Sequence, residues 1–137
     1  MSADEYIIEA RRLLQYARED LETAETLLTH TLVFRHICWL TQQAVEKMFK
    51  AALFALRVDF PRAHDLDVLR NLLPDGWRVK DQFPDLAEMT EWAVESRYPG
   101  DWPEAKEIDA ENALNQAKMI WNVIRKDIQQ NLPDLME

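Results

Sequence analysis

The sequence predicts an all-α fold, an antiparallel up-and-down bundle of about five helices that forms a single domain over residues 1–137. Long segments repeat apolar residues at the three- and four-residue spacing of a helix face, and no segment shows the apolar–polar alternation of a strand. Only two of the 137 residues are glycine, which is too few for the tight turns of a β protein. These observations favour helices packed around one core.

The first expected helix begins at Ser2, which together with Glu5 has the form of a capping box. One seam of large apolar residues repeats every seven positions along this helix, and an alanine lies between successive members. Because the intervening residue is always small, a neighbouring helix can approach closely. The large residues are Ile7, Leu14, Leu21 and Leu28, and the small ones are Ala10, Ala17 and Ala24.

The second expected helix covers about residues 31–56, and its apolar residues wrap well over half of its circumference. Such a wide apolar surface indicates either a central helix with neighbours on most sides or a helix that meets another subunit. The second alternative makes Gln42, Gln43, Lys47 and Phe49 candidate contacts of a homodimer, in which the glutamines would set the register.

Three further helices are expected. A short third helix covers "LDVLRNLL", with Asp65 as its N-cap and Pro74 beyond its end. A fourth begins near Pro84 and ends around "SRYPG". The fifth is expected to start at a second capping box, formed by Asp101 and Glu104, and to run to the C-terminal region.

The net charge of −9 is distributed unevenly along the chain. Residues 1–56 carry six Lys or Arg against eight Asp or Glu, residues 57–80 carry five against four, and residues 81–137 carry five against thirteen. We therefore expect no long-range attraction of nucleic acid to the whole molecule. A local anion site is expected only near the middle segment.

Cysteine use and hydropathy indicate a cytoplasmic protein. The single cysteine, Cys38, cannot form an internal disulfide and lies among apolar residues, so a core thiol is expected rather than a reactive one. The longest uninterrupted apolar run, residues 51–56, is far shorter than a membrane span. We expect no membrane contact.

Few residues could carry nucleophilic or metal chemistry. None of His30, His36 and His64 has a glutamate three positions earlier, so the Glu-x-x-His pairs of di-metal bundles are absent. The sequence also lacks a glycine-rich phosphate loop. No metal and no cofactor is expected.

The stretch "FPRAHDL" contains the best candidate for an anion site. His64 lies there among Arg57, Arg62 and Arg70, at the break before the third helix. An imidazole, guanidinium groups and the free N–H groups of a helix start together suit a phosphate. The alternative is structural, with His64 and Asp65 capping the helix and pinning the loop.

Arg97 and Tyr98 form a second candidate, because a tyrosine can stack on a base while an arginine holds a phosphate. Packing of the loop is the alternative. The third and fifth helices of an antiparallel bundle start at the same end, so the two loops could share one cleft. The short third helix could instead lie across the bundle and separate the loops. Arg62, His64, Arg97 and Tyr98 are therefore the candidate nucleotide- or anion-binding residues.

Four stretches, in this order, resemble the HEPN domain family (higher eukaryotes and prokaryotes nucleotide-binding domain), in its small stand-alone prokaryotic form. They are "AREDLETAETLL", "QQAVEKMFKAAL", "HDLDVLRNLL" and "SRYPG", and the resemblance covers roughly residues 10–130. It implies an all-α bundle that is usually a homodimer and is often encoded beside, or fused to, a small nucleotidyltransferase. Many such pairs resemble toxin–antitoxin modules.

The resemblance also implies an activity for catalytic members, which are metal-independent ribonucleases. Their Arg-x(4–6)-His motif is shared across the dimer, with the arginine on the scissile phosphate and the histidine in proton transfer. This chain departs from that motif, since residues 102–104, where a histidine would follow Arg97, are Trp, Pro and Glu. Arg57 and His64 have the required separation but span a helix end and a proline-containing loop. The catalytic candidates are thus Arg57, His64 and Arg97, and we expect no ribonuclease activity.

Three functions remain open on the sequence. The first is a homodimeric module that binds a nucleotide or a partner and works with a small nucleotidyltransferase in a toxin–antitoxin-like pair. The second is a metal-independent ribonuclease toxin acting on RNA, and the third is a purely structural dimerisation bundle.

Overall fold

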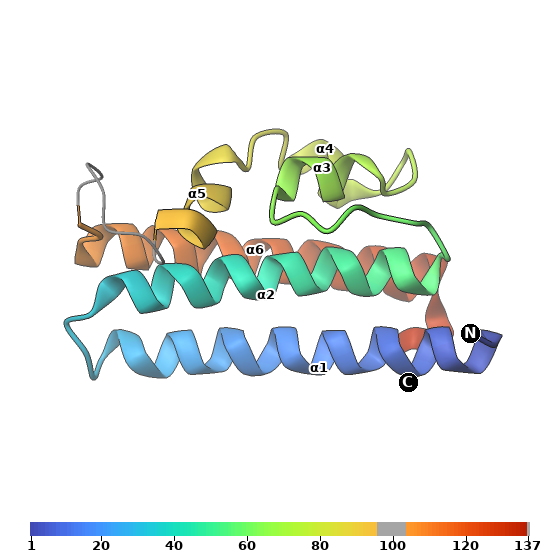
Figure 1. Cartoon of the computed structure of the whole chain (residues 1–137), viewed down its shortest axis with the longest axis horizontal. Coiled ribbons are helices and arrows are strands. Elements are labelled where there is room, and N and C mark those ends of the chain that lie inside the picture. The colour runs from blue at the N-terminus through green and yellow to red at the C-terminus, as the bar shows by residue number, and fades with distance from the viewer. Residues whose placement is uncertain (96–103, 137) are drawn as a thin grey trace.

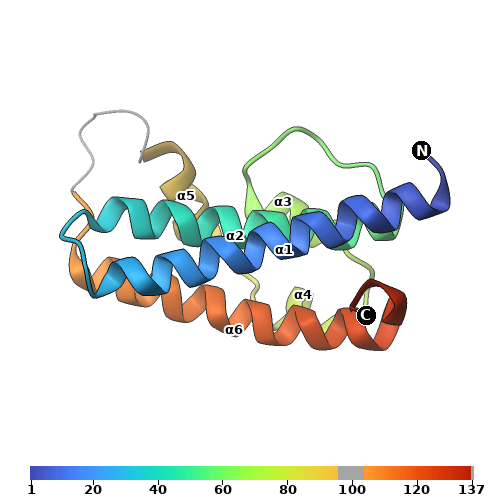
Figure 2. The ribbon, with the colours of Figure 1, turned by 90° about the horizontal axis from the view of Figure 1, so that it is seen from below.

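The computed structural model describes residues 1–95 and 104–136, and every regular element in these residues is a helix. Three long helices lie side by side (Figures 1 and 2), and the shorter α3, α4 and α5 cover one side of them. The short helices lead the chain back to the end where α2 begins, so that α6 runs in the direction of α2 and opposite to α1 (Figure 1). The long helices are α1 (Ala3–Leu28), α2 (Phe34–Ala55) and α6 (Glu107–Asn131), and the short ones are α3 (Leu66–Asn71), α4 (Arg78–Gln82), α5 (Ala87–Glu95) and the 3-10 helix η1 (Pro133–Met136).

The seam predicted for α1 is confirmed. Ser2 Oγ accepts a hydrogen bond from the backbone N–H of Glu5 at 3.2 Å, as expected for the cap. The three interleaved alanines have no exposed surface, and α1 packs along α2. Small residues at these positions allow the close approach of the two helices.

Helix α2 is the centre of the bundle. It contacts α1, α3, α5 and α6, so neighbours from the same chain cover most of its circumference. A central position in the bundle is therefore enough to explain why α2 has such a wide apolar surface. The width of this surface by itself gives no evidence for a second subunit. The helix begins at Phe34, later than expected, because Thr31 Oγ1 accepts the N–H of Val33 in a turn before it.

The third expected helix is confirmed as α3, with the Asp65 carboxylate at its N-cap. Helix α4 was not expected, and its start is capped from another part of the chain. The backbone N–H groups of Arg78 and Val79 donate to Asp127 of α6 at 3.1 and 2.9 Å. Because this carboxylate lies 48 residues further along the chain, no local signal predicts α4. The described residues thus contain six α-helices rather than about five.

Helix α6 starts later than the predicted capping box. Glu104 lies before the helix, and Asp101 lies outside the described residues. The observed start is at Glu107, where the N–H of Lys106 donates to the Asp109 carboxylate at 2.8 Å. In the part of the chain that the structure describes, no helix is long and apolar enough to cross a membrane.

Candidate functional site

The polar strip of α2 meets the segment before α3 at four side chains, Gln42, Glu46, Lys50 and His64, which we call the polar junction. Glu46 is only 5% exposed although it is an acid. Its Oε1 lies 2.7 Å from Nδ1 of His64, and its Oε2 accepts a hydrogen bond from Lys50 Nζ at 3.2 Å. The buried carboxylate is therefore compensated by two basic side chains.

Gln42 holds the same segment through its backbone. Its side chain is fully buried, and Nε2 donates to the carbonyl oxygen of His64 at 3.1 Å and to Glu46 Oε1 at 3.3 Å. The amide oxygen of Gln42 accepts from Gln43 Nε2 at 2.7 Å. A largely buried helix keeps these polar residues because they fasten the segment before α3 to α2.

The ring of His64 is held at one edge and open at the other. Its side chain is 47% exposed. An ionised carboxylate can only accept hydrogen bonds, so Nδ1 carries the proton that faces Glu46. Nε2 then lies on the far edge of the ring, where it can accept a proton or, once protonated, donate to an anion.

The backbone N–H groups at the start of α3 are already occupied. The N–H of Leu66 donates to Thr90 Oγ1 of α5 at 3.0 Å, and the next two N–H groups donate to Asp65 Oδ1 at 3.0 and 3.3 Å. The free N–H groups expected at this helix start are therefore not available to a phosphate. The structural alternative, in which His64 and Asp65 cap α3 and pin the loop, agrees with these contacts.

The arginines of this region have different environments. Arg62 is exposed and makes no hydrogen bond or ion pair within residues 1–95 and 104–136. Arg57 is exposed too, with its guanidinium carbon 5.1 Å from the centre of the Tyr6 ring. Arg70 is buried and donates to the carbonyl oxygen of Phe83 at 2.6 Å, so it holds the fold together rather than facing a ligand.

The second predicted loop site, Arg97 with Tyr98, lies outside the described residues. The helices that follow the two loops begin at different places along the bundle (Figure 1). The start of α3 lies against Gln42 and Thr90, whereas the start of α6 lies beside the turn of residues 29–34. This separation arises because α3 lies along the middle of α2 instead of starting at an end of the bundle.

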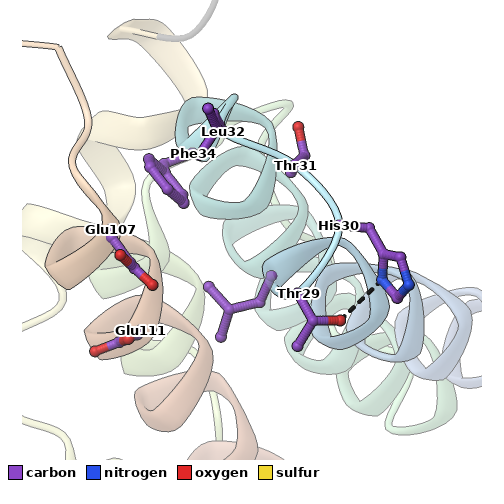
Figure 3. Close-up of a pocket in the computed structure, with 8 residues that line it drawn as sticks. Thr29, His30, Thr31, Leu32, Phe34, Glu107 and Glu111 are labelled. Carbon is purple, nitrogen blue, oxygen red and sulfur yellow. Dashed lines mark hydrogen bonds between the residues drawn. The ribbon is translucent and has the colours of Figure 1, made fainter.

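An open hollow of about 610 Å³ lies between the turn of residues 29–34 and the start of α6 (Figure 3). Two carboxylates, Glu107 and Glu111, lie on its α6 side and would repel a phosphate. Nδ1 of His30 is occupied by Thr29 Oγ1 at 2.8 Å. The hollow is therefore unsuited to an anion. Its lining comprises Leu28, Thr29, His30, Thr31, Leu32, Phe34, Glu107 and Glu111.

The residues that could bind a metal or act as a thiol were located within the described ranges, 1–95 and 104–136. No group of three or more His, Cys, Asp or Glu side chains there could hold a metal ion. Cys38 is fully buried in α2. The carboxylates of Glu88 and Glu91 on α5 are exposed to solvent.

The four candidate contacts of a homodimer are not equally accessible. Gln42 and Phe49 have no exposed surface within one chain. Lys47 is half-buried and forms an ion pair with Asp20 of α1, and Gln43 is half-buried as well. A second copy could therefore reach only Gln43 and Lys47 without a change in fold, and the homodimer stays a prediction.

The sequence was compared with known protein families, and one family matches it. Residues 10–127 match the family described as HEPN domain. The chain belongs to the HEPN domain family. The resemblance of its four sequence stretches to HEPN proteins is thereby confirmed, and so is the all-α bundle that the resemblance implies.

Two solved structures resemble this HEPN protein. The crystal structure of TT1696 from Thermus thermophilus is 26% identical and superimposes with a TM-score of 0.74, covering 86% of this chain and 97% of that chain. The crystal structure of ST0689, an archaeal HEPN homologue, is 23% identical with a TM-score of 0.50, covering 93% and 98%, and shows the fold alone. None of the curated proteins compared with the chain matches it.

Proposed function

We propose that this HEPN protein binds the phosphates of a nucleotide at the polar junction, through His64 and the neighbouring Arg62. One observation carries the proposal: a buried carboxylate, Glu46, holds the Nδ1 edge of a half-exposed imidazole and leaves the Nε2 edge without a protein partner in the described residues. Arg62, two residues earlier, has no partner in the described parts of the chain. A guanidinium and an oriented imidazole can together bind a phosphate without help from helix N–H groups.

We further propose that the protein acts in the cytoplasm as a homodimeric module that works with a small nucleotidyltransferase, in a toxin–antitoxin-like pair. Membership of the HEPN family supports this proposal, since the family resemblance implies such partners. The half-buried Gln43 and Lys47 offer part of the accessible surface of α2 for a second copy.

Titration with ATP, followed by the NMR shifts of backbone amides, tests the phosphate site. We expect shifts at residues 57–66 and along the α2 face that carries Glu46. The variant His64→Ala should lose them, whereas His36→Ala, which removes an exposed histidine from the first turn of α2, should keep them. Shifts confined to α6, or no shifts at millimolar ATP, would refute the site.

Ribonuclease activity is the second candidate function. A carboxylate-oriented imidazole is the arrangement of a general base, and Glu46 with His64 has this geometry. Against it, Arg57 and His64, the only Arg-x6-His string, lie beyond the end of α2 and are separated by a proline-containing loop rather than lying on one helix. The binding module therefore has the better support.

A further inference from the structure

A chain of contacts between rings and cations connects the end of α2 to the polar junction. The guanidinium of Arg57 lies over the Tyr6 ring at 5.1 Å, and the Tyr6 and Phe54 ring centres are 6.2 Å apart. Phe54 meets Phe60 edge-on at 5.7 Å, and Lys50 Nζ lies 5.8 Å from the centre of the Phe60 ring. We call Tyr6, Phe54 and Phe60 the aromatic platform. All three residues are half-buried, so the platform retains area that a ligand can cover.

Arg57 has a backbone conformation that its residue type disfavours, because its φ of 57° lies in the left-handed region. It directly follows the C-cap of α2. The N–H groups of Arg57 and Val58 donate to the carbonyls of Phe54 and Leu53 at 3.0 and 2.9 Å, the pattern that closes a helix and that favours glycine at this position. The pattern uses only backbone atoms, so the helix end does not explain why the residue is an arginine.

The charge of Arg57 has no acidic partner. Its guanidinium makes no hydrogen bond or ion pair within residues 1–95 and 104–136, and the side chain is exposed. Asp59, two residues later, is exposed and likewise unpaired in these ranges. At the other edge of the platform, the charge of Lys50 is compensated by Glu46. The five donors of the Arg57 guanidinium are therefore available to a ligand.

We infer that the aromatic platform is a stacking surface for the base of the nucleotide whose phosphates bind at the polar junction, and that Arg57 contacts the far edge of that base. Aromatic rings bind bases by stacking, and a guanidinium pairs best with two adjacent acceptors, such as O6 and N7 of guanine. Lys50 and Arg57 are seven residues apart along α2 and its C-terminal cap, about 10 Å at the helical rise, which is the length scale of a nucleotide. The strained backbone of Arg57 is then retained for ligand recognition. This inference rests on the proposed phosphate site.

Calorimetric titration with GTP and with inorganic triphosphate separates the two proposals. Both ligands should bind if the phosphate site exists, and GTP should bind roughly tenfold more tightly because the base adds contacts. Arg57→Gly should weaken GTP binding part of the way toward the level of inorganic triphosphate, because the stacking contacts remain, and should leave the binding of inorganic triphosphate unchanged. Arg35→Ala, which removes an exposed arginine from the first turn of the same helix, should change neither.

Thermal unfolding of the same variants gives a second readout. Because glycine is unstrained at φ 57°, Arg57→Gly should melt at the same or a higher temperature if the arginine serves recognition. A lower melting temperature with unchanged GTP binding would show that Arg57 serves only to cover Tyr6, and would overturn the inference. Equal affinities of the wild-type protein for GTP and inorganic triphosphate would refute the platform while leaving the phosphate site intact. Failure of both ligands to bind would refute both proposals.

Discussion

Glu46 and His64 lie 18 residues apart in sequence and 2.7 Å apart in space, and their contact ties the loop after α2 back onto the middle of the same helix. The contact pairs a carboxylate that is almost fully buried with a ring that is nearly half exposed. The segment from Arg57 to Asp65 is therefore held at its far end by side chains of the helix from which it departs.

Replacing Glu46 with alanine should destabilise the fold by about 2–4 kcal/mol. The change removes the carboxylate oxygens that accept hydrogen bonds from the buried amide of Gln42 and from the ammonium group of Lys50. Urea unfolding of Glu46→Ala measures the loss. The matched control is Glu22→Ala on the exposed face of α1, which should stay within about 0.5 kcal/mol of wild type. Equal midpoints for the two variants would show that the junction contributes nothing to stability.

Removal of the Asp127 carboxylate should disorder α4. Asp127 is 2% exposed and accepts two backbone N–H groups, so Asp127→Asn should cost about 1–3 kcal/mol. Hydrogen exchange should show faster exchange at Val79 and its neighbours. The exposed Asp134 provides the control, and Asp134→Asn should leave that exchange unchanged. Slow exchange at Val79 in the Asp127 variant would contradict the capping role.

A larger residue in the alanine seam of α1 should force α1 and α2 apart. Ala17 has no exposed surface, and Ala17→Leu should cost about 1–3 kcal/mol through overpacking. Thr23→Leu, on the exposed side of α1, should be close to neutral. Differential scanning calorimetry compares the two variants, and equal melting temperatures would mean that the helices are not in close contact.

The homodimer can be tested by analytical ultracentrifugation. The protein should sediment with twice the 16.2 kDa mass of one chain at micromolar concentration. If α2 supplies the interface, Gln43→Glu should shift the protein toward the monomer, because the symmetric contact would bring like charges together. Lys47 is left unchanged in this variant, since it pairs with Asp20 of its own chain. A mass of one chain for the wild-type protein would exclude the dimer under these conditions.

RNA should remain intact when incubated with the protein in metal-free buffer. We expect this because no histidine follows Arg97 at the required separation, and because Arg57 lies beyond the end of α2, where a proline-containing loop separates it from His64. Gel analysis of a labelled RNA provides the measurement. Cleavage that disappears in His64→Ala would overturn the expectation, and cleavage that survives this change would implicate other residues.

The helices that the sequence predicts best are those whose signals are local. The alanine seam and the Ser2 cap lie within α1 itself, so periodicity is enough to place that helix. In contrast, α4 depends on Asp127, and no pattern within residues 78–82 reveals a cap from α6. The same reason explains why the described residues hold one helix more than expected.

The candidate site was predicted in part. The sequence predicts His64 and Asp65 at the helix start, and the structure adds Glu46 as the residue that orients the ring. The sequence contains one indication of this contact. Gln42, Glu46 and Lys50 are spaced by four residues on an otherwise apolar helix, which indicates that a polar segment of the chain packs against that face. Which loop meets it could not be predicted, because residues 57–65 are held on α2 by contacts between residues distant in sequence, such as those of His64 with Gln42 and Glu46.

The cap that Asp127 provides for α4 has a consequence for the order in which the chain folds during synthesis. The ribosome makes α1 and α2 first, and their contacts can form as soon as both have emerged. A five-residue helix cannot persist alone, so α4 must wait until residue 127 has been added. Until then Trp77 and Val79, which are buried in the finished protein, lack part of their cover. These two apolar residues are thus expected to stay accessible to chaperones and proteases until the chain beyond residue 127 has been made.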